Sequence, residues 1–126
     1  MKTLIAEIEQ MPMTFPDWWD GFGAKGINET AANLAKEVLI ELSEYADEQT
    51  EVNPTCNGTI DISFYGKFRG LVEVGDTSIS YYIKYDNKEG GKGQSHKNDD
   101  NDTDWLNHLK YCIQKAIKIN LTLLHP

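Results

Sequence analysis

The feature that most constrains the fold of this chain is an alternation of apolar and polar residues between positions 57 and 84. Apolar side chains occupy alternate positions in three short segments, and polar side chains stand between them. Because successive side chains of a strand project to opposite faces of a sheet, this period of two predicts three strands with one apolar and one hydrated face. The apolar positions are Ile60, Ile62, Phe64, Phe68, Val72, Val74, Ile79, Tyr81 and Ile83.

Short turn-forming sequences separate the three segments and predict an antiparallel meander. Tyr65-Gly66-Lys67 and Gly75-Asp76-Thr77 are typical of hairpin loops, and Asn57-Gly58 predicts a tight turn into the first strand. The polar positions should then lie in water on the second face of the sheet. They are Asp61, Ser63, Arg69, Glu73, Ser80 and Tyr82.

Two longer segments have the spacing of an amphipathic helix. One spans residues 28–45, with Asn28 as its N-cap, and the other follows a cap at Asp102 or Thr103. Their apolar stripes should cover the apolar face of the sheet. The stripes are Ala31, Leu34, Ala35, Val38, Leu42 and Tyr45 in the first, and Trp105, Leu106, Leu109, Ile113, Ala116 and Ile117 in the second.

The N-terminal segment is predicted to be a short helix over residues 3–11, ended by Pro12. A strand is the alternative, because Leu4, Ala6 and Ile8 also alternate. The polar residues 47–53 are interpreted as a link that leads to Pro54. The predicted fold class is α+β: a three-stranded antiparallel meander with one apolar face covered by two main helices, plus the short N-terminal helix.

Residues 86–103 interrupt the pattern with eighteen positions that include three glycines and no large aliphatic side chain. Such a composition offers little apolar burial to offset the entropy of ordering, so it predicts a mobile loop. With this loop, residues 1–126 form a single domain, long enough to bury a core without disulfides or metals.

Charge and hydropathy limit the partners of this domain. Twenty acidic and twelve basic residues leave a net charge of −8, which argues against direct binding of nucleic acid and favours either solubility or a basic protein partner. No stretch approaches the ~20 apolar residues of a membrane span, and Glu7 and Glu9 interrupt the N-terminus before a signal sequence could form. A cytoplasmic protein without membrane contact is expected.

Residues 17–26 form an aromatic and glycine-rich loop with Trp18, Trp19, Asp20 and Phe22. Asp20 before Gly21 is a turn signature, in which the carboxylate accepts hydrogen bonds from backbone amides. The favoured interpretation is structural, with Trp19 buried at one end of the core and Trp18 partly exposed. The alternative is a binding surface, since aromatic residues are enriched among interface hot spots.

Residues with catalytic or ligating chemistry do not form a recognisable motif. Cys56 and Cys112 are widely separated and are expected to be buried free thiols. Asp100, Asp102 and Asp104 have the alternation of a calcium loop, but the positions for its glycine and its final glutamate hold other residues. Residues 89–95 lack the spacing of a phosphate-binding loop, and a linker is expected there. The sequence therefore predicts no enzyme, no cofactor and no metal site.

The segment from Trp19 to Ala24, the helix after it, and Pro54 with Asn57-Gly58 before the strands resemble a group of small bacterial and phage-borne proteins. Members of that group tend to have a Trp-Asp-Gly-aromatic-Gly-Ala loop, then a helix and a short meander. The resemblance covers residues 17–84, and Gly26 stands where a proline is common in the group. It implies the fold but no activity and no functional residues, because the group has no established function.

The function predicted from these observations is a non-catalytic protein-binding regulator or inhibitor, encoded by a phage or mobile element. Binding would use the loop residues Trp18, Trp19, Asp20 and Phe22, or the edge of the sheet. One alternative is an acidic inhibitor that mimics nucleic acid and acts on a defence or DNA-processing protein. The other is a small-molecule-binding protein with a pocket beneath residues 86–103.

Overall fold

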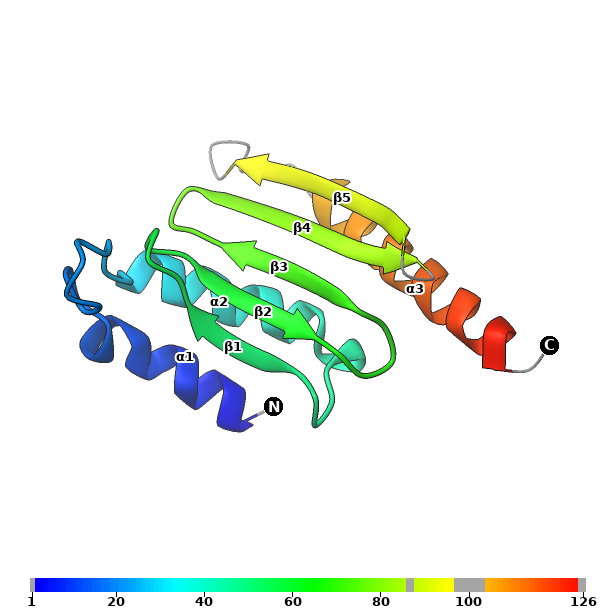
Figure 1. Cartoon of the computed structure of the whole chain (residues 1–126), viewed down its shortest axis with the longest axis horizontal. Helices are drawn as coiled ribbons and strands as arrows, with labels where there is room; N and C mark the ends of the chain where they lie inside the picture. The colour runs from blue at the N-terminus through cyan, green and yellow to red at the C-terminus, as the bar shows by residue number, and fades with distance from the viewer. Residues whose placement is uncertain (1, 86–87, 97–103, 125–126) are drawn as a thin grey trace.

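The computed structural model describes residues 2–85, 88–96 and 104–124, and it is an α+β fold with a five-stranded antiparallel sheet. In Figure 1 the helices of residues 29–41 and 104–124 lie behind the sheet, the N-terminal helix lies beside one edge of it, and the front face of the sheet is open. The elements are α1 (Lys2–Thr14), α2 (Glu29–Glu41), a 3-10 turn η1 (Ser43–Tyr45), β1 (Glu51–Pro54), β2 (Ile60–Phe64), β3 (Gly70–Val74), β4 (Ser78–Tyr85), β5 (Lys88–His96) and α3 (Asp104–Leu124).

The predicted meander is confirmed as the centre of this sheet, in strands β2, β3 and β4. The register places Ile62 opposite Val72 and Val72 opposite Tyr81, so the apolar positions of neighbouring strands share one face. Helix α2 packs against β2 and β3, and α3 packs against β4 and β5. The two main helices therefore cover the apolar face as predicted, and α1 adds contacts to α2 and β1.

Strand β1 was missed because it has the composition of a loop. The predicted polar link in fact contains the start of a strand, with Val52 as its one buried side chain. A tight hairpin joins β1 to β2, in which Thr55 N–H donates to Thr59 O at 2.9 Å and Gly58 has a φ of 78°. Pairing with β2, rather than local propensity, makes these residues a strand.

The predicted mobile loop at residues 86–103 is wrong for Lys88–His96, which form strand β5 along β4. The remaining residues, 86–87 and 97–103, lie outside the described part of the chain. Glycines are required in β5 because its neighbours already fill the space that a side chain would need. A Cβ at Gly91 would overlap Cys112 Sγ, and one at Gly93 would lie 2.6 Å from Tyr81 Cζ. The linker expected at residues 89–95 is part of the same strand.

The helices agree with the sequence except at their ends. Pro12 does not end α1, which continues to Thr14 because Ile8 and Met11 bury their side chains and Phe15 N–H still reaches Met11 O at 2.8 Å. Asn28 is the N-cap of α2, since its Oδ1 accepts from Ala31 N–H at 2.8 Å. The cap residues proposed for α3, Asp102 and Thr103, lie outside the described residues.

Burial corrects two further predictions. Cys112 is buried as expected, but Cys56 is exposed in the β1–β2 hairpin. Ser63 points to the open face as predicted, yet it is only 8% exposed because the side chains around it rise above it. None of the helices in the described residues is long and apolar enough to cross a membrane.

Two adjacent positions in β3 test the register of the sheet. Val72 is fully buried, whereas Leu71 is 36% exposed on the open face. Val72→Asn should lower the free energy of unfolding by at least ~3 kcal/mol, because it buries an amide without partners and leaves a cavity. Leu71→Asn should cost less than ~1.5 kcal/mol. Urea denaturation of both variants measures the difference, and equal midpoints would contradict the register.

The close approach of β5 to α3 gives a second prediction. Gly91→Ala should cost about 1–3 kcal/mol, because the new methyl group meets Cys112. In a Cys112→Ala background the sulfur is absent, so the same substitution should cost less. A double-mutant cycle by thermal denaturation measures this coupling. Strictly additive effects would show that Gly91 and Cys112 are not in contact.

Candidate binding surfaces

The aromatic loop, defined here as residues 16–26, joins α1 to α2 and is tied down by many hydrogen bonds. Asp20 Oδ1 accepts from the backbone N–H groups of Phe22 and Ala24, at 2.8 and 3.1 Å. This confirms the turn role predicted for Asp20. Asp17 Oδ1 likewise accepts from Gly26 N–H at 2.8 Å.

Backbone contacts also connect the aromatic loop to the rest of the domain. Trp18 N–H donates to Ala24 O, and Lys25 N–H donates to Cys56 O in the β1–β2 hairpin, each at 2.8 Å. The loop is therefore held both internally and against the sheet. Its conformation is fixed by contacts within the domain.

The two tryptophans of the loop have different environments. Trp19 is half-buried, and its ring packs edge-on against Phe15 with the centroids 5.1 Å apart. Its Nε1 is buried and has no hydrogen-bond partner among the described residues. Trp18 is 68% exposed and has a φ of 65°, a strained conformation for a bulky residue. The predicted burial of Trp19 in the core is therefore wrong, since Trp19 is only half-buried, and Trp18 is largely rather than partly exposed.

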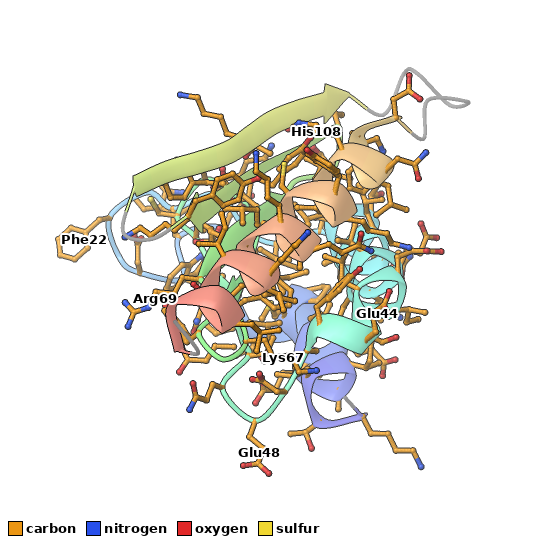
Figure 2. All side chains as sticks on the ribbon, turned by 90° about the vertical axis from the view of Figure 1, so that its right-hand side faces the viewer. Phe22, Glu44, Glu48, Lys67, Arg69 and His108 are labelled. Atoms are coloured by element: carbon orange, nitrogen blue, oxygen red, sulfur yellow. The ribbon has the colours of Figure 1, made fainter. Side chains whose placement is uncertain are left out.

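Phe22 lies at the tip of the aromatic loop and is 91% exposed. Figure 2 shows its ring pointing away from the body of the protein. The backbone N–H of Phe22 donates to Asp20 Oδ1, so the backbone that carries the ring is fixed. Phe22 is thus an apolar projection at the tip of the aromatic loop, and Trp18 exposes a second ring in the same loop.

A second surface was not predicted from the sequence. The open face of the sheet contains a hollow of about 330 Å³, whose floor includes Ser63. Leu71 of β3 lies directly opposite Ser63, and Tyr82 of β4 lies beyond Leu71 in the same cross-strand row. We call this feature the open-face hollow. Its lining residues are Asp61, Ser63, Phe64, Tyr65, Arg69, Gly70, Leu71, Tyr82 and Lys84.

Asp61 is the unusual residue of the open-face hollow. Its Oδ1 is buried and has no hydrogen-bond partner among the described residues. Glu73 lies directly opposite it on β3, and Glu73 Oε2 accepts from Thr59 Oγ1 at 2.8 Å. Burial, together with repulsion from Glu73, raises the pKa of Asp61 to about 6.

Two cations stand at the other end of the open-face hollow. Arg69 and Lys84 are both exposed. Arg69 immediately precedes β3 and lies beside Lys84 of β4, whose N–H donates to Arg69 O at 2.9 Å. The ion pairs found in the described residues, Lys36–Glu9 and Lys110–Glu41, do not involve them. The hollow is therefore acidic at one end and basic at the other.

A third polar cluster lies between α3 and β4 but is closed to solvent at its thiol. Tyr81 Oη is 2.6 Å from His108 Nδ1, and Cys112 Sγ is 3.6 Å from His108 Nε2. Burial, and secondarily the Cys112 thiol, raises the pKa of Tyr81. Cys112 is 2% exposed, so a substrate cannot reach its sulfur. These contacts join α3 to the sheet.

Comparisons with known proteins give no functional assignment. A scan against protein-family models and searches of curated proteins and of solved structures found no match to this chain. The aromatic loop and the open-face hollow are the surfaces whose geometry bears on function.

The pKa of Asp61 predicts how stability depends on pH. Between its ordinary value of 3.8 and about 6, the folded protein keeps a proton that the unfolded chain releases, so stability falls as pH rises through this window. Asp61→Asn stays neutral and should raise the free energy of unfolding by about 1 kcal/mol at pH 8, a figure discounted for partial exposure to water. The gain should vanish near pH 4.

Urea denaturation at pH 4, 6 and 8 tests the role of Asp61. Glu51→Gln is the matched control, because it removes one charge from an exposed position in the edge strand β1. It should change stability by less than ~0.5 kcal/mol at each pH. A wild type that is more stable than Asp61→Asn at pH 8 would contradict the raised pKa of Asp61.

Proposed function

We propose that this protein is a non-catalytic regulator that binds a protein partner through the aromatic loop, with Trp18 and Phe22 as the anchors. The observation that carries the proposal is the 91% exposure of Phe22 on a loop fixed by its own hydrogen bonds. A large ring held in water contributes little to folding. Its position is explained if it is buried when a partner binds.

The energetics of the loop favour this interpretation. Full burial of an aromatic side chain in a partner pocket stabilises a complex by about 1.5–3 kcal/mol. Because the loop is already ordered, binding does not incur the cost of fixing its backbone. Trp18 supports the same conclusion, since a residue in the left-handed region costs roughly 1–3 kcal/mol and such residues cluster at functional sites.

The net charge and the burial of the Cys112 thiol suggest the kind of partner and the role. The net charge of −8 favours a partner with a basic surface around an apolar pocket. The described thiol that lies beside a histidine, Cys112, is inaccessible, which favours binding over catalysis. A regulator or inhibitor that acts by occupying its partner fits both observations.

Affinity capture from a lysate of the source organism, with the wild type and Phe22→Ala side by side, tests the proposal. A protein retained by the wild type should be lost with Phe22→Ala, and its purified form should bind the variant about 30-fold more weakly, or ~2 kcal/mol. Thermal denaturation should show Phe22→Ala as stable as the wild type, because the ring makes few contacts within the domain.

Tyr111→Ala is the control for this experiment, because Tyr111 is another exposed aromatic residue, 60% exposed on α3 and away from the loop. It should retain the partner. Asp20→Ala should weaken binding although both anchors remain, since it frees the amides of Phe22 and Ala24. A partner that is retained equally by Phe22→Ala would refute the role of the loop.

A further inference from the structure

The open-face hollow has the charges of a ligand site that the fold itself does not need. Asp61 Oδ1 is buried without a hydrogen-bond donor, and Glu73 beside it adds a second negative charge. Because Oδ1 is closed to solvent, a ligand would act on the charge of the Asp61 carboxylate from the hollow that this residue lines, and not on that oxygen itself. A cationic donor suits this end best, because it would offset both carboxylates at once.

The basic end of the open-face hollow, with Arg69 and Lys84, favours an anionic group of a ligand. Arg69 and Lys84 hold two like charges side by side, with no ion pair to another described residue. Figure 2 shows Arg69 on the side of the molecule away from Glu44, so the helices do not cover it. A carboxylate would pair with both cations, and a single negative charge suits a face that already carries Asp61 and Glu73.

Distance selects the size of the ligand. Asp61 and Tyr65, which line opposite ends of the hollow, are four residues apart, or about 13 Å along an extended chain. The ammonium and carboxylate of one amino acid are too close together to span this length. An extended peptide covers roughly 3.3–3.6 Å per residue, so three residues reach about 10 Å. The long side chains of Arg69 and Lys84 can reach across the remaining distance of about 3 Å to the peptide carboxylate.

The volume and the lining of the hollow agree with a ligand of this size. Its 330 Å³ lies at the lower end of the range of small-molecule sites, roughly 300–1,000 Å³. Leu71 and Tyr82 supply apolar surface between the charged ends, against which a central aliphatic side chain can pack. The Ser63 hydroxyl at the floor provides a polar group for a peptide bond.

We propose that the open-face hollow binds a short free peptide of about three residues, with its α-ammonium group at Asp61 and its α-carboxylate between Arg69 and Lys84. The peptide crosses the open face from β2 toward β4 and uses none of the residues of the aromatic loop. This site is independent of the protein partner proposed above. A substitution in the open-face hollow need not alter binding at the aromatic loop, and the reverse also holds.

NMR titration of the ¹⁵N-labelled protein with the tripeptide Ala-Leu-Ala tests the site. Amide shifts should saturate and be confined to the strands that line the open-face hollow, β2, β3 and β4. N-acetylated and C-amidated Ala-Leu-Ala should each bind at least about 10-fold more weakly, because each loses one charge-assisted contact. Phe22→Ala should bind the tripeptide as the wild type does, which separates this site from the aromatic loop.

Single variants assign each end of the peptide. Arg69→Gln should weaken Ala-Leu-Ala about 10-fold and leave the C-amidated form unchanged, and Asp61→Asn should do the same with respect to the N-acetylated form. Lys67→Gln is the matched control, because it removes the same charge from a neighbouring lysine that bonds Glu44 O on the helix side. It should leave binding unaltered.

Three results would overturn the proposal. The first is no saturable shift on the open face at about 10 mM tripeptide, far above the range of specific small-molecule binding. The second is an N-acetylated or C-amidated peptide that binds as tightly as the free one, which would reduce the site to recognition of a single charge. The third is an equal loss of affinity in Arg69→Gln and Lys67→Gln, which would indicate a general effect of net charge.

Discussion

Burial of one face of the sheet, and of that face alone, governs the rest of this structure. Helices α2 and α3 and the core residues of α1 all pack against the side that carries Ile62, Val72 and Tyr81. Because the sheet has no second layer of helices, its other face must be satisfied by solvent, by its own side chains or by a ligand. Large side chains around Ser63 turn this face into a hollow instead of a flat polar surface.

The one-sided arrangement also explains why two accessible surfaces can coexist. The aromatic loop lies at one end of the sheet, where Lys25 N–H bonds Cys56 O of the β1–β2 hairpin. The open-face hollow lies among β2, β3 and β4. Each surface carries a feature that folding does not require: the ring of Phe22 in water, and the unpaired Oδ1 of Asp61. Departures of this kind are expected at functional positions.

Strand β5 depends on contacts that lie far away in the sequence. Its glycines leave room for Tyr81, Tyr85 and Cys112, and side chains from β4 and α3 thus occupy the space that the strand itself leaves vacant. Tyr81 is fixed in turn by His108 of α3 at 2.6 Å. The last helix and the last strand therefore stabilise each other.

The sequence by itself determined the α+β class, the apolar and polar faces of β2 to β4, the N-cap Asn28 and the turn formed by Asp20. Each follows from local periodicity or from hydrogen bonds between residues close in the chain. Only the tertiary structure decided β1, β5 and the open-face hollow. Strand β1 exists through pairing with β2, and β5 through pairing with β4 and packing against α3, so neither has a pattern of its own. The open-face hollow requires that Asp61 of β2, Arg69 just before β3 and Lys84 of β4 lie on one face of the sheet. Their spacing along the chain does not indicate this. Strand pairing brings together residues that are far apart in the sequence, and it decides which charged side chains line the open-face hollow.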